Sequence, residues 1–148
     1  MSILNSLQRL EELTQIIPPL LSAIPDEELS HKPQPNKWSK KQILGHLIDS
    51  AANNHQRFVR IQYEKEPIIF YDQDQWNLLN HHHDLDRKHL VEFWIVYNKH
   101  LVQLASKIAG ENLERKGIGK DGQPKTLGWY IEDYVVHMEH HLRQIVEY

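Results

Sequence analysis

Apolar residues recur every three or four positions in four stretches of the chain, a spacing that is typical of amphipathic helices. The stretches are residues 3–17, 39–66, 84–110 and 126–148. The third is the most regular, with apolar positions at Leu90, Phe93, Trp94, Tyr97, Leu101, Leu104 and Ile108. The pattern therefore predicts four helices, each with one face in a common core.

Capping residues mark where three of these helices should begin. Ser39 and Gln42 have the spacing of a capping box, in which each side chain bonds the backbone of the other residue. Thr126 precedes the fourth helix, and Asp84 or Asp86 precedes the third. Short side chains with an oxygen are preferred at these positions because they accept hydrogen bonds from free backbone N–H groups.

Prolines mark where helices should stop. A proline inside a helix loses a hydrogen bond and clashes with the preceding turn. Pro18 and Pro19 should therefore break or kink the first helix before a short helical continuation to Ile24. Pro67 should end the second helix, and Gly110 occupies the usual position at the end of the third.

The connections between the helices differ in character. Residues 25–38 contain three prolines and are expected to be an extended loop. Residues 68–83 form a long polar connection, which we expect to fold back on the body as a lid because it holds three aromatic residues, Phe70, Tyr71 and Trp76. Residues 117–124 are rich in glycine and are compatible with a short hairpin. We predict an all-α fold, a four-helix bundle, in a single domain over residues 1–148.

Composition narrows the classes of function. The chain has 17 Lys and Arg against 20 Asp and Glu, and the basic residues are scattered, so no nucleic-acid partner is expected. Neither a signal peptide nor a stretch long enough for a membrane span is recognisable, and we expect a cytoplasmic protein with no membrane partner. There is no cysteine, so any thiol that reacts here must arrive with a substrate.

The predicted fourth helix carries a possible half of a metal site. His137 and His141 are four residues apart, so they share one helix face beside the stripe of apolar residues, Ile131, Val135, Met138, Leu142 and Ile145. The chain contains 11 histidines, so one such pair is also expected by chance. Two surface histidines remain an alternative.

The predicted second helix offers a third ligand. His46, Asp49, Asn53 and Arg57 recur at three- and four-residue steps beside the core stripe, although a solvated polar face is the simpler interpretation. The tract 81–83 consists of three consecutive histidines, which do not share a helix face, so we interpret them as exposed loop residues and leave them out of the site.

Three imidazoles without a fourth protein ligand would form the open coordination sphere of a catalytic site. Imidazoles suit zinc or nickel, and the divalent ion would act as a Lewis acid that lowers the pKa of a bound water or thiol. Asp49, one turn after His46, is the candidate catalytic residue that orients a ligand or accepts the released proton. The alternative for Asp49 is a surface carboxylate.

Several motifs resemble those of the DinB/YfiT-like superfamily. They are Trp38-Ser39 at a helix start, Gly45-His46-Leu47-Ile48-Asp49-Ser50 within that helix, and His137-Met138-Glu139-His140-His141 followed by Arg143-Gln144-Ile145. The resemblance extends from about residue 24 to residue 145. It implies a four-helix protein with a divalent metal ion on three histidines, His46, His137 and His141.

Further motifs are most similar to the YfiT branch, which includes bacillithiol S-transferases and has been labelled metal-dependent hydrolase. They are Asp49-Ser50 with Asn53, Arg57-Phe58, Tyr71-Asp72 and Trp76. The superfamily also includes a thiol-dependent isomerase. The chain ends three residues after Ile145, so we expect that it lacks any substrate contacts made by a C-terminal extension of the branch.

Three functions remain open from the sequence. The first is an S-transferase that joins a small-molecule thiol to an electrophilic substrate, with Arg57 and Trp76 contacting anionic or apolar parts of the substrates. Arg57 is equally suited to a structural ion pair. The second is a hydrolase in which hydroxide on the metal attacks an amide or ester. The third is a non-catalytic, stress-related bundle. For each we expect a homodimer.

Overall fold

The structure, a computed structural model, describes residues 2–148. Its body is a bundle of four long helices, α1 (Ile3–Ser22), α3 (Lys40–Arg60), α5 (Arg87–Ser106) and α7 (Leu127–Leu142). Helix α1 packs on α5 and α7, and α3 packs on the same two helices, so α1 and α3 occupy opposite corners of the bundle. The predicted all-α, four-helix fold is confirmed.

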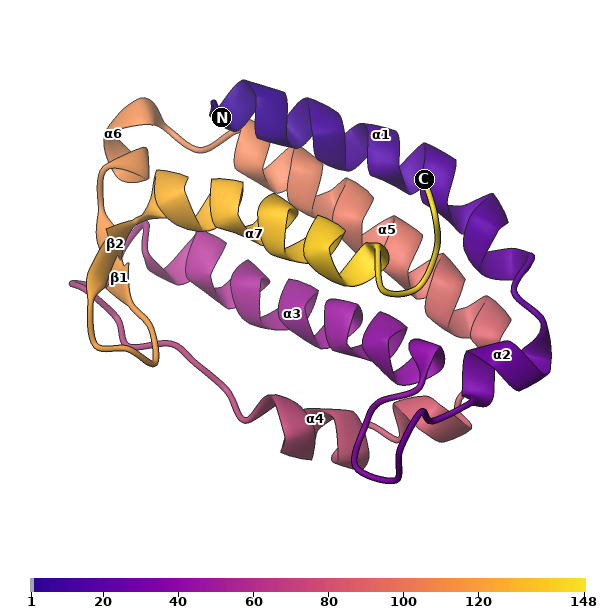
Figure 1. The fold of residues 1–148 in the computed structure, drawn as a ribbon. Coiled ribbons are helices and arrows are strands. Elements are labelled where there is room, and N and C mark those ends of the chain that lie inside the picture. Colours follow the sequence, from indigo (N-terminus) through magenta and orange to yellow (C-terminus); the bar gives the residue numbers. More distant parts are fainter. Residues whose placement is uncertain (1) are drawn as a thin grey trace.

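The helix directions explain why the connections are long. In Figure 1, α1 and α7 run in one direction, whereas α3 and α5 run in the other. The chain therefore crosses a diagonal of the bundle between α1 and α3, and again between α5 and α7. Between the parallel helices α3 and α5, residues 61–86 must return along the full length of the bundle.

Helix α1 does not break at its prolines. It continues through Pro18 and Pro19 to Ser22, contrary to the predicted break. Ile17 and Leu21 are almost completely buried on either side of the prolines, so packing outweighs the lost backbone hydrogen bonds. The Arg87 guanidinium also donates to the carbonyl oxygens of residues 21 and 22 at the end of the helix, and of residue 24 beyond it.

The predicted helix starts are correct. Ser39 and Gln42 form both hydrogen bonds of the capping box, and Thr126 caps α7. Of the two candidates for α5, Asp86 is the cap. These side chains satisfy backbone N–H groups that the helices themselves leave free.

Three predicted helix ends are wrong. Helix α3 ends at Arg60 and is followed by turns, rather than continuing to Glu66. Helix α5 ends at Ser106, and Gly110 instead begins the short helix α6 (Gly110–Leu113). Helix α7 ends at Leu142, although Ile145 still reaches the core.

Two connections contain regular structure. The predicted extended loop after α1 includes the short helix α2 (Asp26–Ser30), which buries Leu29. The glycine-rich connection forms an antiparallel hairpin of β1 (Lys116–Ile118) and β2 (Pro124–Thr126), as its composition suggested. Gly122 has a φ of 76°, a left-handed conformation that glycine adopts without a steric penalty.

The segment of residues 68–86, which we call the α4 arm, is not the expected irregular loop. It contains helix α4 (Gln73–Leu79) and a 3₁₀ turn (His82–Asp84), and both contact α3. Tyr71 and Trp76 are half-buried as expected, whereas Phe70 is 54% exposed. The arm therefore lies on the bundle as a structured cover.

The apolar stripe of α7 lies in the core as predicted, with all five of its residues at most 3% exposed. The stripe predicted within residues 84–110 contains one error, because Phe93 is 42% exposed. Among residues 2–148, no helix combines the length and the apolarity that a membrane crossing requires.

Candidate metal centre

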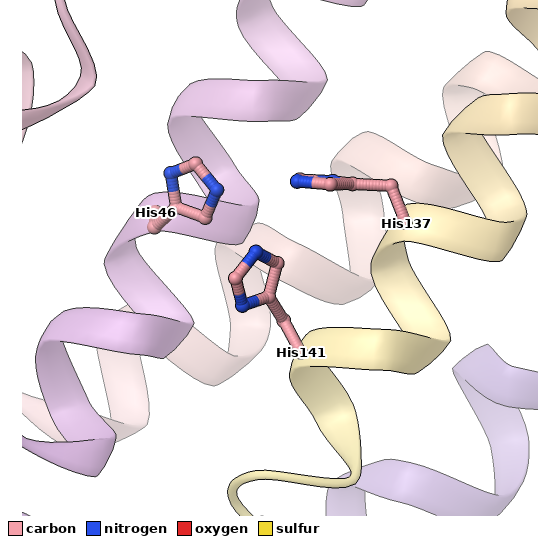
Figure 2. A group of neighbouring side chains, drawn as sticks. All are labelled: His46, His137 and His141. Atoms are coloured by element: carbon pink, nitrogen blue, oxygen red, sulfur yellow. The ribbon is translucent and has the colours of Figure 1, made fainter.

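Three histidines meet between the antiparallel helices α3 and α7. His46 lies on α3, and His137 and His141 lie on successive turns of α7 (Figure 2). One nitrogen of each ring lies within 4.8 Å of the nitrogens of the other two. The ring centroids of His46 and His141 are 4.8 Å apart, and those of His137 and His141 are 4.6 Å apart. The structure thus brings together the three residues proposed from the sequence.

The hydrogen bonding of these rings leaves nitrogens free for an ion. Both ring nitrogens of His46 are buried without a hydrogen-bond partner in residues 2–148, an arrangement that is costly unless another ligand completes it. His141 Nδ1 lies 2.9 Å from Gln144 Oε1, which leaves Nε2 free and fixes the ring. The donor set therefore fits a divalent metal ion.

Their surroundings keep the histidines neutral. Burial, together with the smaller effects of the neighbouring His141 and His137, lowers the pKa of His46 from 6.5 to about 3. Burial also lowers the pKa of His137 to about 4 and lowers the pKa of His141. Neutral imidazole is the form that binds a metal, so the rings need not lose protons at neutral pH.

The polar face of α3 is buried rather than solvated. His46 and Asp49 are 2% exposed and Asn53 is 3% exposed, so the interpretation of this face as solvated surface is wrong. Asn53 donates a hydrogen bond to the backbone carbonyl of Asp49. This face becomes internal because the α4 arm and α7 both cover it.

Asp49 pairs with a histidine that sequence reasoning dismissed. Its Oδ1 lies 2.8 Å from His82 Nε2 and accepts a hydrogen bond from Asn80, whereas its Oδ2 is buried without a partner. His82 is 4% exposed, so the expectation of an exposed loop histidine is wrong for this residue. A Cβ atom on Gly45 would lie 2.2 Å from the His82 ring, so the close approach of the ring requires glycine there.

A small cavity of about 150 Å³ lies beside His46 and His137. Its other walls are polar and aromatic, formed by Ser50, Asn54, Arg57, Tyr71, Gln73, Asp133 and Tyr134. A wider hollow of about 510 Å³ reaches His141, and Gln73 lines both spaces. A larger hollow of about 840 Å³ lies between α1, α2 and α5 and includes none of these residues. The chemistry of the residues in the site therefore distinguishes it, and its size does not.

The two candidate substrate-binding residues differ in position. Arg57 lines the cavity, with its guanidinium 4.9 Å from the ring centre of Tyr130. Trp76 is not in the cavity wall. Its ring packs edge-on against the ring of Tyr71, which does line the cavity. Any influence of Trp76 on a ligand in this cavity must therefore pass through Tyr71.

Several wall residues were missed from the sequence. Asp133 lies four residues before His137, and Ser50 and Asn54 follow His46 at four-residue steps, so helical spacing contained a signal for all three. Gln73 is the first residue of the short helix α4, which has too few turns for a periodicity that predicts which side chains face the bundle.

The fold and the site define a class of protein: helix bundles in which three histidines on facing helices are suited to hold a divalent metal ion. The chain belongs to the DinB superfamily, whose sequence profile matches residues 9–145. This match confirms the resemblance noted in the sequence motifs.

Proteins with similar sequences are provisionally named as metal-dependent hydrolases. A protein of Oceanobacillus iheyensis, named provisionally as a metal-dependent hydrolase, is 23% identical over 140 residues, which cover 94% of this chain and 80% of that protein. A protein of Bacillus cereus with the same provisional name is 26% identical over 144 residues, with the same coverage.

Solved structures show the same fold. YfiT from Bacillus subtilis, described provisionally as a metal-dependent hydrolase with an unusual four-helix bundle topology, matches with a TM-score of 0.87. It is 23% identical, and the match covers 97% of this chain and 83% of that one. The mycothiol-dependent maleylpyruvate isomerase matches with a TM-score of 0.80 at 9% identity, over 98% of this chain and 61% of that one.

Proposed function

We propose that this protein is a metal-dependent enzyme that transfers a small cellular thiol to an electrophilic small molecule. The observation that carries the proposal is the meeting of His46, His137 and His141 beside a polar cavity. Three neutral imidazoles leave room in the coordination sphere of zinc or nickel for a further ligand. When bound, the ion supplies Lewis acidity, which lowers the pKa of a thiol or water that it holds.

A thiol is favoured as the incoming nucleophile for two reasons. The chain has no cysteine, so it cannot supply a thiol nucleophile itself. A protein with the same fold is named for its dependence on mycothiol. An entering thiol would need the cavity beside His46 and His137, because that space adjoins the candidate ligands.

The remaining residues would position the substrate and receive its proton. Arg57 lines the cavity and would bind an anionic part of a substrate, whereas Trp76 would hold Tyr71 in place. We propose Asp49 as the proton acceptor, since its Oδ2 is a buried carboxylate oxygen that lacks a partner among residues 2–148. His82 and Asn80 hold the other oxygen and fix the carboxylate.

Conjugation with a chlorinated aromatic compound tests the proposal. Metal-loaded protein and a small thiol should form a carbon–sulfur bond as chloride leaves, and a chelator should abolish the reaction. His141→Ala should reduce conjugation to background, whereas His140→Ala, one residue away on the exposed side, should retain it. Absence of conjugate above background with a panel of small thiols would exclude this function.

Hydrolysis of an amide or ester is the second candidate, and the provisional names of the sequence relatives favour it. It would use the same three histidines, with water in place of the thiol. Activity on such a substrate that survives complete removal of thiols would decide for hydrolysis.

We also propose a homodimer in the cytoplasm. The exposed Leu78 and Leu79 of α4, 64% and 67% accessible, support self-association, since burial of such side chains is favourable. The mass of the purified protein in solution tests the dimer, and a monomer at micromolar concentration would contradict it.

A further inference from the structure

The cavity beside the histidines contains two opposite charges. Arg57 reaches it from α3, and Asp133 reaches it from α7. Within residues 2–148 neither side chain takes part in an ion pair closer than 4.0 Å. Their charges nevertheless influence each other across the cavity. Two charges that face one space without touching leave both free for a ligand.

The Arg57 guanidinium is fixed but not fully used. Its terminal nitrogens donate to Asn54 Oδ1 at 3.2 Å and to the carbonyl of Ile69 at 2.9 Å. Its plane is further held by the Tyr130 ring. Its Nε–H donor is buried and has no partner among residues 2–148. A buried donor of this kind is costly unless a ligand accepts its hydrogen bond.

Asp133 is the negatively charged counterpart of Arg57 in the cavity wall. Among the described residues, no hydrogen bond satisfies its carboxylate, and burial raises its pKa although Arg57 and Lys125 oppose that change. The Lys125 ammonium lies 5.1 Å from the ring centre of Trp129, where it forms no ion pair with Asp133. Asp133 is an exposed residue in the cavity wall, so its carboxylate, which pairs with no cation of residues 2–148, is open to a positively charged ligand group.

We propose that Arg57 and Asp133 together recognise a zwitterionic group, with the carboxylate of the ligand on Arg57 and its ammonium on Asp133. The cavity of about 150 Å³ has the volume of about five water molecules, at roughly 30 Å³ each, which suits the end of a small amino acid. With its charged end held there, the side chain of such a ligand would lie beside His46 and His137.

The proposed substrate class is therefore an amino thiol with free amino and carboxylate groups. This part rests on the proposed function, because only thiol transfer requires sulfur at the histidines. Recognition of the zwitterion itself depends on Arg57 and Asp133 and needs neither metal nor thiol.

Binding of three thiol-free probes to the metal-free protein tests the inference separately from the reaction. The probes are L-2-aminobutyrate, which carries both charges, butyrate, which lacks the ammonium, and n-propylamine, which lacks the carboxylate. Isothermal titration should show that aminobutyrate binds roughly tenfold or more tightly than either other probe, because each charge-assisted hydrogen bond adds affinity.

Matched variants identify the residues responsible. Asp133→Asn should remove most of the advantage of aminobutyrate over butyrate, whereas Glu132→Gln, which removes the neighbouring charge outside the cavity, should preserve it. Arg57→Gln should weaken the binding of aminobutyrate and of butyrate to a similar extent. If that variant fails to fold, the Asp133 comparison still decides the question, since Asp133 makes no hydrogen bond that the fold would lose.

Three results would overturn the inference. They are equal binding of the three probes, absence of aminobutyrate binding at millimolar concentration, and equal effects of Asp133→Asn and Glu132→Gln. If aminobutyrate binds as expected but no thiol is conjugated, the recognition site stands and the proposed reaction fails.

Discussion

Single residues show how closely the α4 arm is attached to the site. Asp49 and His82 form a buried pair one turn of α3 from His46, and Gly45 leaves the space that the His82 ring fills. Two further contacts hold the arm: Asn77 donates to the carbonyl of Gln42, and His83 lies 3.4 Å from Ser39 Oγ. Of these, the Asp49–His82 pair is the most deeply buried.

His82→Ala should destabilise the protein by roughly 3 kcal/mol, because it leaves the buried Asp49 carboxylate without its main partner. Urea unfolding monitored by circular dichroism measures the change. The matched variant His83→Ala removes a half-buried ring with one long contact and should cost less than about 1 kcal/mol. Equal losses of stability in the two variants would show that the buried Asp49–His82 pair does not stabilise the fold.

The metal-free protein should become less stable as the pH is lowered. The pKa of His46 is lowered to about 3 and that of His137 to about 4, so both stay neutral in the fold while the unfolded chain takes up protons near pH 6.5. The unfolded state then binds more protons, and unfolding becomes easier as the pH falls from 6.5 towards 4. Each histidine contributes a slope of up to about 1.4 kcal/mol per pH unit.

Urea unfolding of chelator-treated protein at about pH 7 and about pH 5 measures this effect against the unperturbed histidine pKa near 6.5. The His46→Asn, His137→Asn double variant should show a smaller loss of stability than the natural chain. If the free energy of unfolding changes as much between the two pH values in the variant as in the natural chain, the pH dependence cannot be assigned to these histidines.

At the scale of elements, helix starts were predictable and helix ends were not. Ser39, Asp86 and Thr126 are caps whose chemistry is local, so their sequence positions sufficed. Ends depend on packing: α1 continues through Pro18 and Pro19 because its buried face continues. The regular structure of the α4 arm likewise depends on its contacts with α3, so the sequence of the arm shows little helical periodicity.

Thr126→Ala should reduce stability by about 1 kcal/mol, because Thr126 Oγ1 accepts a hydrogen bond from the backbone N–H of Trp129, in the first turn of α7, at 3.1 Å. Since α7 carries His137 and His141, the affinity for a metal ion should fall with it. Thr126→Ser keeps the cap and serves as the control. Thermal unfolding of both variants provides the comparison, and equal melting temperatures would show that the cap is dispensable.

At the scale of the molecule, the bundle was predictable from the four apolar stripes, whereas its topology was not. Apolar periodicity identifies the helices and their buried faces but not which helices are neighbours. The diagonal arrangement of α1 and α3 places α3 against α7, and only this contact joins His46 to His137 and His141. Helical spacing and the family resemblance indicated the three histidines, and spacing also held an unused signal for Asp133, whereas His82 needed the assembled structure.

The metal content of the protein tests the central claim most directly. Protein purified without an affinity tag and dialysed against zinc or nickel should bind one ion per chain, measured by elemental analysis. His46→Ala, His137→Ala and His141→Ala should each lose that ion, because two imidazoles hold a divalent metal far more weakly than three. His140→Ala should keep it. A natural chain without stoichiometric metal, or a His141→Ala variant that still binds one ion per chain, would contradict the claim and favour a non-catalytic bundle.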